Sequence, residues 1–118
     1  MREYSFEKLE VWKLSRKLNV KVYLLSNKFP NSELFGLTSQ LRRASISICS
    51  NIAEGSGRDG INEQRNFYNI AYGSLMEVLN QLMLCVDLGY LNEDYLNNGL
   101  RPIIEKISLA LHKLKTKC

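Results

Sequence analysis

The stretch GLTSQLRRASISICSNIAEGSGR, residues 36–58, has the length and apolar spacing of a helix, but its polar residues are unusual for one. Two adjacent arginines, Arg42 and Arg43, stand near its start, serines recur between its apolar residues, and glycines close it. Ala, Leu, Glu and Lys would form a more stable isolated helix. The residue types therefore indicate that this stretch makes specific contacts on more than one face.

Steps of 100° per residue place this stretch in three sectors of a helical wheel. The sector that predicts the core holds Leu41, Ala44, Ile48, Ile52 and Gly55, with Ser45 at its margin. A second, narrower apolar sector holds Ile46, Cys49 and Ala53, with Arg42 inside it. The third sector is polar and holds Arg43, Ser47, Ser50 and Glu54, with Gln40 and Asn51 at its border. The two arginines therefore face different surroundings.

The second sector predicts contact with another subunit. A solvated helix face is normally built from Lys, Glu or Gln, and Ile46, Cys49 and Ala53 are none of these. Most soluble oligomers consist of identical subunits, so we expect these residues and Arg42 to form a homo-oligomer interface. The alternative is that the sector is the edge of a wide core, because single apolar residues are common on protein surfaces.

Arg43 and Glu54 lie in the same polar sector, three turns apart, which is too far for a direct bond within one helix. Each must therefore find a partner elsewhere. For Glu54 we expect an opposite charge on a neighbouring helix or subunit. For Arg43 the same interpretation and a contact with phosphate both stay open, because the guanidinium group suits phosphate well.

Every other apolar pattern in the chain also has the helical period, and none has the period of a strand. Short connectors separate the expected helices, which favours an all-α, antiparallel up-down-up-down four-helix bundle. The predicted helices cover residues 6–28, 38–55, 62–88 and the segment from 92 onward. At 118 residues, the chain fits a single domain spanning residues 1–118.

Specific residues predict where these helices begin and end. Thr38 and Asn62 are suited to cap the second and third helices, and Gly89 is suited to the C′ position that follows the third. Asn92 should open the last helix. Gly99 and Pro102 should kink or break it, because a proline inside a helix removes a hydrogen bond and costs about 3 kcal/mol.

Composition and cysteine usage predict a soluble protein of the cytoplasm. The chain is 45% hydrophobic and 24% charged, which is ordinary for a globular domain. Its N-terminus lacks the apolar region of a signal peptide, and no uninterrupted apolar stretch is long enough to span a membrane. Cys49, Cys85 and Cys118 form neither an even set nor a CxxC pair, so reduced thiols are expected.

The chemistry of an enzyme or a metal site is missing from the sequence. The single histidine, His112, has no Glu three residues before it, so the Glu-x-x-His motif of di-iron bundles is absent. The cysteine spacing is not that of a zinc site. The glycine-rich segment EGSGRDG, residues 54–60, lacks the GK[ST] of a P-loop. We therefore expect no catalytic residues, no metal and no cofactor.

The distribution of charge favours nucleic acid as a partner. The net charge is +4, and the basic residues concentrate in the first and last helices and in the stretch that holds the two arginines. Lys13, Lys17 and Lys21 recur every four residues and so share one helix face. In a single copy this is an ordinary solvated face. Repeated around an oligomer, it becomes a positive surface that attracts nucleic acid by counterion release, in a salt-sensitive and sequence-tolerant way.

The chain also resembles a known family, in segments that cover nearly its whole length. These segments are FEKLEVWKLSRKL, FPNSELFGLTSQLRRASISICSNIAEGSGR, FYNIAYGSLMEVLNQL and LGYL. They look like the bacterial four-helix-bundle proteins encoded by intervening sequences within 23S ribosomal RNA genes. The match is most specific across GLTSQLRR and SNIAEG. Cys49 departs from it, since relatives often carry Pro or Ala there, and so does the interruption from Gly99 to Pro102.

This resemblance implies an assembly and a partner. It implies a pentameric ring, and a similarity to the accessory proteins of diversity-generating retroelements, which form basic pentameric barrels that bind nucleic acid. By that analogy Arg42, Arg43 and Arg58 contact nucleic acid, with RNA the expected kind. The alternative function is a structural module that docks a partner protein such as a reverse transcriptase.

Overall fold

The computed structural model describes residues 1–117, and within them the chain is entirely helical, with no strand. The main helices are α1 (Glu10–Ser26), α2 (Leu37–Ser56), α3 (Ile61–Asp87) and α5 (Arg101–Lys117). A single turn, α4 (Glu93–Tyr95), and a π-helical turn, η3 (Leu96–Leu100), lead directly into α5. Two short 3₁₀ turns are η1 (Ser5–Lys8) and η2 (Asn31–Glu33). The prediction of an all-α fold with four helices is confirmed.

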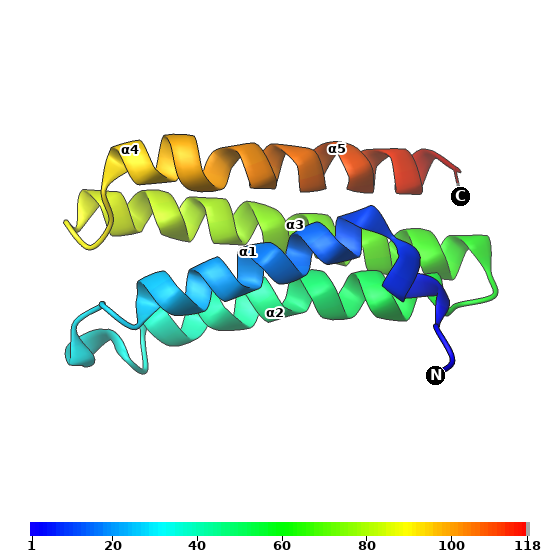
Figure 1. Ribbon diagram of the computed structural model, residues 1–118, viewed down its shortest axis with the longest axis horizontal. Helices are drawn as coiled ribbons and strands as arrows, with labels where there is room; N and C mark the ends of the chain where they lie inside the picture. Colours follow the sequence, from blue (N-terminus) through cyan, green and yellow to red (C-terminus); the bar gives the residue numbers. More distant parts are fainter. Residues whose placement is uncertain (118) are drawn as a thin grey trace.

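The four helical segments lie side by side along the long axis of the molecule, with their connectors at alternate ends (Figure 1). Helix α1 packs against α2 and α5, and α3 packs against the same two helices. The described part of the chain measures 43 × 26 × 25 Å along its principal axes. Two seams of this bundle concern function: the one between α1 and α5 and the one between α2 and α3.

The predicted core face of α2 is buried as expected. Leu41, Ile48 and Ile52 are almost completely shielded from solvent. They pack with residues that recur every three or four positions on the other helices, including Leu18 and Val22 of α1, Leu75 and Leu82 of α3, and Ile107 and Leu111 of α5. Ser45 is fully buried rather than marginal, because its hydroxyl donates to Asn19 Oδ1 of α1 at 2.9 Å.

Small residues bring α2 and α3 close together. The hydroxyl groups of Ser47 and Ser74 form a hydrogen bond of 2.8 Å across this seam. Asn51 Nδ2 donates to the backbone oxygen of Ser47 at 2.8 Å, which holds the amide against its own helix. At Gly55 the helices approach so closely that a Cβ there would lie 2.8 Å from Cε1 of Tyr68. Serine and glycine therefore have packing roles at this seam.

Two of the predicted caps were wrong. Helix α2 is capped by Gly36, and Thr38 lies buried inside the first turn. The carboxylate of Glu33 accepts the backbone N–H of Leu37 at 3.4 Å, so the threonine hydroxyl is not needed as a cap. Similarly, α3 begins at Ile61 and its N-cap is the extended residue Gly60, so Asn62 is not the cap of this helix.

The boundaries of the first and third helices also differ in detail from the prediction. Helix α1 begins at Glu10 rather than near residue 6, since residues 5–8 form the tighter turn η1. Gly89 has a φ of 82° after the end of α3, a left-handed conformation that glycine adopts without strain. The predicted C′ glycine is thereby confirmed.

The break predicted at Gly99 and Pro102 does not occur: residues 93–117 are continuously helical, and only residues 96–100 depart from the regular α-helix. Asn92 caps it as predicted, with its Oδ1 accepting the N–H of Tyr95 at 3.2 Å. Residues 96–100 then form the π turn, in which the N–H of Arg101 bonds to the carbonyl of Leu96. This wider turn accommodates Pro102, which has no N–H to donate and whose ring crowds the carbonyl four residues earlier in a regular helix.

Candidate nucleic-acid interface

Some lysines of α1 and α5 line grooves at the two ends of the seam where these helices pack. Lys13 and Lys17 are exposed and line neither groove, whereas Lys21 is half-buried. On α5, Lys113 and Lys117 line a groove of about 330 Å³ between the C-terminal end of α5 and the first turn of α1. Lys113 and Lys117 therefore place positive charge at one end of the seam between α5 and α1.

A second groove lies at the other end of the same seam. It has a volume of about 630 Å³ and is formed by the second half of α1 and the connector that leads into α4. Lys21 and Lys28 line it together with apolar and aromatic side chains. No acidic residue lines this groove, whereas Glu10 lines the first one. The second groove is therefore the more favourable surface for an anion.

Arg42 is held inside the chain. Its Nε donates to Ser26 Oγ at 2.8 Å, and its Nη2 donates to Asn27 Oδ1 at 2.9 Å. The guanidinium carbon lies 4.7 Å from the centre of the Tyr23 ring, within the range of a cation–π contact. These contacts attach α2 to the last turn of α1, so Arg42 has a structural role in the position where nucleic-acid binding was predicted.

Arg43 has different surroundings, as the helical wheel predicted. It is exposed and lines a polar groove of about 370 Å³ between α2 and α3, together with Ser47, Ser74 and Glu77. Among residues 1–117 its side chain has neither a hydrogen bond nor an ion pair, and the same holds for the side chain of Glu54. The opposite charge expected on a neighbouring helix is therefore not found in the described part of the chain.

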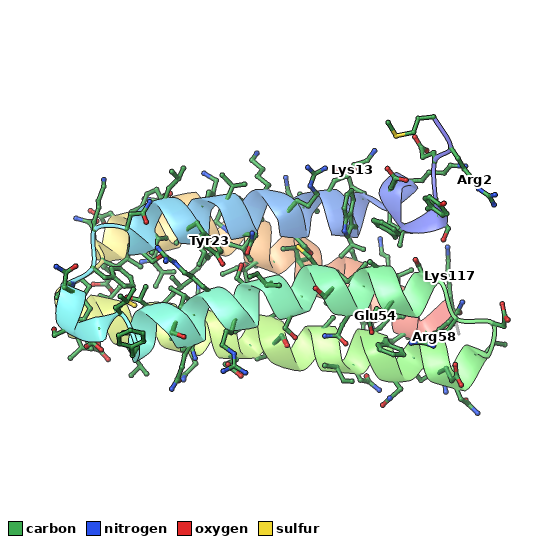
Figure 2. All side chains as sticks on the ribbon, turned by 90° about the horizontal axis from the view of Figure 1, so that it is seen from below. Arg2, Lys13, Tyr23, Glu54, Arg58 and Lys117 are labelled. Carbon is green, nitrogen blue, oxygen red and sulfur yellow. The ribbon has the colours of Figure 1, made fainter. Side chains whose placement is uncertain are left out.

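Arg58 lies in the connector between α2 and α3, with its guanidinium carbon 4.8 Å from the centre of the Phe67 ring. Figure 2 shows it at the end of the bundle where these helices meet, while Lys13 lies on α1. The six predicted nucleic-acid contacts thus do not form one patch. Lys13 and Lys17 lie on the exposed surface of α1, and Lys21 lines the second groove. Arg42 and Arg43 are neighbours on α2 and both line a groove beside Ile46, while Arg58 lies at one end of the bundle.

The predicted oligomer interface combines exposed and half-buried residues. Ile46 is 43% exposed. Arg42, Cys49 and Ala53 are half-buried, which is what the alternative of a wide core edge predicts for them. Burial raises the pKa of the Cys49 thiol to about 11, even though the positive charge of Arg16 on α1 acts in the opposite direction. The two halves of this sector therefore differ in environment.

Sequence reasoning missed an apolar cluster beside Ile46. Phe35 is 94% exposed in the connector before α2, and the neighbouring Leu34 is also exposed. Together with Tyr23 and Ile46 they line a groove of about 340 Å³. The signal in the sequence was the pair Leu34-Phe35 placed in a connector between a proline and a glycine, where no core position is expected.

The described residues do not form a metal site or a membrane-spanning helix. Among residues 1–117, no three His, Cys, Asp or Glu side chains are grouped so that they could hold a metal ion. None of the helices in that range combines the length and the apolar character needed to cross a membrane. Cys85 is fully buried, and burial raises the pKa of its thiol to about 11. Cys118 lies outside the described residues.

The comparison with protein families identifies the bundle. Residues 7–113, nearly the entire chain, match the family model described as 23S rRNA-intervening sequence protein. None of the curated proteins compared with the chain matches it. The chain belongs to the family of 23S rRNA-intervening sequence proteins.

Proposed function

We propose that this protein is a non-enzymatic, oligomeric bundle that binds nucleic acid, RNA in particular, without a cofactor. The observation that carries the proposal is the row of lysines along α1, which leads to a groove lined by Lys21 and Lys28 and by no acidic residue. Lysines hold phosphate as point charges and carry no sequence code, so binding is sequence-tolerant. Its affinity decreases steeply with salt because counterions are released on binding.

The arginines have separate roles in this proposal. Arg43 and Arg58 are exposed and are available to phosphate. Arg42 instead positions α2 against α1 through its bonds to Ser26 and Asn27. A change of Arg42 should therefore lower stability first and binding only as a consequence, whereas a change of Arg43 should affect binding alone.

Neutralising the α1 row tests nucleic-acid binding. The variant carries Lys13→Gln, Lys17→Gln and Lys21→Gln, and binding to labelled RNA is followed by fluorescence anisotropy across a salt series. We expect weaker binding and a slope of log affinity against log salt that is smaller by about 2–3. Wild-type protein that fails to bind RNA at about 20 mM salt, where phosphate contacts are strongest, would refute the proposal.

The chain offers a matched control for this variant. Asn62, Asn66 and Asn69 are exposed on α3, away from the α1–α5 seam. Replacing all three by Asp changes the net charge by the same amount as the three lysine substitutions. If RNA binding depends on net charge at long range, both variants should bind equally weakly. If it depends on a local lysine surface, the lysine variant should bind RNA much more weakly than the asparagine variant.

The assembly in this proposal is a pentameric ring of antiparallel bundles, with Ile46 and the exposed Leu34-Phe35 pair in contact with a neighbouring copy. An exposed Phe beside other apolar side chains is typical of an interaction surface. Ile46→Glu should split the oligomer with helicity intact, measured by light scattering and circular dichroism. Leu109→Glu is the control, because Leu109 is also an exposed apolar residue, at 65%, and lies on α5, across the molecule from α2. An unchanged mass for Ile46→Glu would remove this interface.

The second candidate function is docking of a partner protein such as a reverse transcriptase, which the exposed Phe35 favours. The lysine variant distinguishes the two functions: loss of RNA binding with retained protein binding supports the first, and the opposite result supports the second. The bacterial and cytoplasmic setting and the relation to diversity-generating retroelements belong to the same proposal. A reading frame inside a ribosomal RNA gene, or one beside a reverse transcriptase gene, would decide between these settings.

A further inference from the structure

The groove of about 630 Å³ beside α4 has features that the lysine rows alone do not explain. It is lined by Lys21, Leu24, Leu25 and Lys28 of α1 and by Tyr90, Leu91, Asn92 and Tyr95. Its volume lies within the range of small-ligand pockets. We call it the tyrosine groove. It combines an apolar floor, two aromatic rings and two positive charges at one place on the surface.

Tyr95 is presented to this groove by the π turn. Its side chain is 41% exposed, and its ring lies directly against the backbone of Gly99. A Cβ at position 99 would lie 2.8 Å from Cε1 and 2.9 Å from Cδ1 of that ring. Glycine is therefore needed for the ring to lie in this position. π turns are frequent at functional sites, and here the turn and its glycine place an aromatic face beside two lysines.

Tyr90 forms a fixed wall of the tyrosine groove. Its hydroxyl donates to Glu33 Oε2 at 3.0 Å, and its ring lies 5.7 Å from the ring of Phe29. The hydrogen bond to Glu33 raises the pKa of the Tyr90 hydroxyl. The phenol therefore stays neutral and attached to the connector that precedes α2. This wall needs no rearrangement before a ligand enters.

The charges at the tyrosine groove select an anionic ligand. Lys21 and Lys28 are seven residues apart, which is two turns of α1 or roughly 10 Å along its axis. Both therefore lie on the same side of the helix, and no carboxylate is among the residues that line the groove. A ligand that suits this surface carries separated negative charges and a flat apolar group between them.

We infer that the tyrosine groove binds an unpaired nucleotide of a single-stranded RNA, with its base against Tyr95 and its flanking phosphates at Lys21 and Lys28. This inference rests on the proposed function and specifies the form of nucleic acid that is bound. Bases in a duplex are stacked and paired, whereas those of a single strand can be splayed onto aromatic side chains. Stacking of this kind is tolerant of sequence, because every base has a π face.

The test compares Tyr95→Ala with the wild-type protein on two probes. One is a labelled oligouridine of about 12 nucleotides, and the other is an RNA duplex of the same length. Loss of the ring should weaken oligouridine binding about tenfold, while binding of the duplex, whose bases cannot enter, changes less than about twofold. Tyr95→Phe keeps the ring and should retain the affinity of the wild-type protein for both probes.

A second pair of variants keeps the inference testable if Tyr95→Ala fails to fold. Leu24 lines the tyrosine groove and is 62% exposed, whereas Val20 lies one turn earlier, is 57% exposed and does not line it. Leu24→Glu and Val20→Glu add the same charge to the same helix face. The inference expects Leu24→Glu to weaken oligouridine binding much more than Val20→Glu does.

The outcomes separate this inference from the proposed function. If the wild-type protein binds neither probe at low salt, both fail. If it binds both probes with the expected salt dependence, and the changes at Tyr95 and Leu24 affect the two probes alike, only the tyrosine groove is refuted. In that case the tyrosine groove does not bind RNA and a polypeptide becomes its candidate ligand, while the lysines still account for RNA binding.

Discussion

The close approach of α2 and α3 at Gly55 can be measured by replacing this residue with alanine. The new Cβ would lie 2.8 Å from Cε1 of Tyr68 and 2.9 Å from Cβ of Phe67. The Tyr68 ring is buried, and the Phe67 Cβ is attached to the backbone and cannot rotate away. The α2–α3 seam must therefore open by several tenths of an ångström.

Two opposing effects set the size of the change. Overpacking in a core costs about 1–3 kcal/mol, while alanine in place of glycine in a helix interior gains about 0.5–1 kcal/mol. For Gly55→Ala we expect a net loss of roughly 1 kcal/mol in the free energy of unfolding. Gly73 provides the matched control: it lies in the interior of α3, and a Cβ there would meet nothing within 4 Å. Gly73→Ala should therefore gain about 0.5–1 kcal/mol.

Urea denaturation followed by circular dichroism measures both variants at one protomer concentration, because oligomerisation contributes to apparent stability. With a urea slope of about 1–3 kcal/mol per molar, the two midpoints should differ by roughly 1 M, with wild type between them. A Gly55→Ala protein that is stabilised as much as Gly73→Ala would show that the helices do not touch at this position, and would refute the reasoning.

Other substitutions test other parts of the bundle. Gly89→Ala should cost about 1–2 kcal/mol because of its left-handed backbone, with a smaller loss for Asn, measured by thermal denaturation. Gln81 is buried and its Oε1 has no hydrogen-bond partner in the described chain, so Gln81→Met should raise the free energy of unfolding by about 1 kcal/mol, measured as a higher midpoint of urea unfolding. Burial raises the pKa of the Cys49 and Cys85 thiols from 9.0 to about 11. The stability that these neutral thiols contribute is therefore present below pH 9.0 and is lost as the pH rises toward 11. Because burial also keeps the thiols protonated, both should alkylate faster at about pH 8 in urea than in the folded protein, as mass spectrometry of the peptides can show.

The helical period was sufficient to predict the core of α2. Leu41, Ile48 and Ile52 are buried where the wheel placed them, because a helix has one face that must pack against its neighbours. The complete burial of Ser45 could not be predicted in the same way. Its burial depends on Asn19, which lies 26 positions earlier and meets it only through the packing of α1 on α2.

The candidate site was harder to predict than the core, because its residues come together only in the fold. The sequence predicted that Arg42 contacts phosphate, whereas in the fold its guanidinium group donates to Ser26 and Asn27. The basic character of the first and last helices could be counted in the sequence. The tyrosine groove could not be predicted, since Tyr95 reaches it only through a π turn that a regular helical wheel does not contain.

The π turn acts as a one-residue insertion within an otherwise regular helix. Because each residue of an α-helix turns by 100°, the extra residue rotates everything before it, including α4, by about that angle relative to α5. Deletion of one residue from 96–100 would restore a regular helix and leave all the side chains of the tyrosine groove in the sequence. Tyr95 would then point in another direction. Within this family, the length of the segment between Asn92 and Pro102 should therefore be a better marker of the groove than the identity of any residue in it.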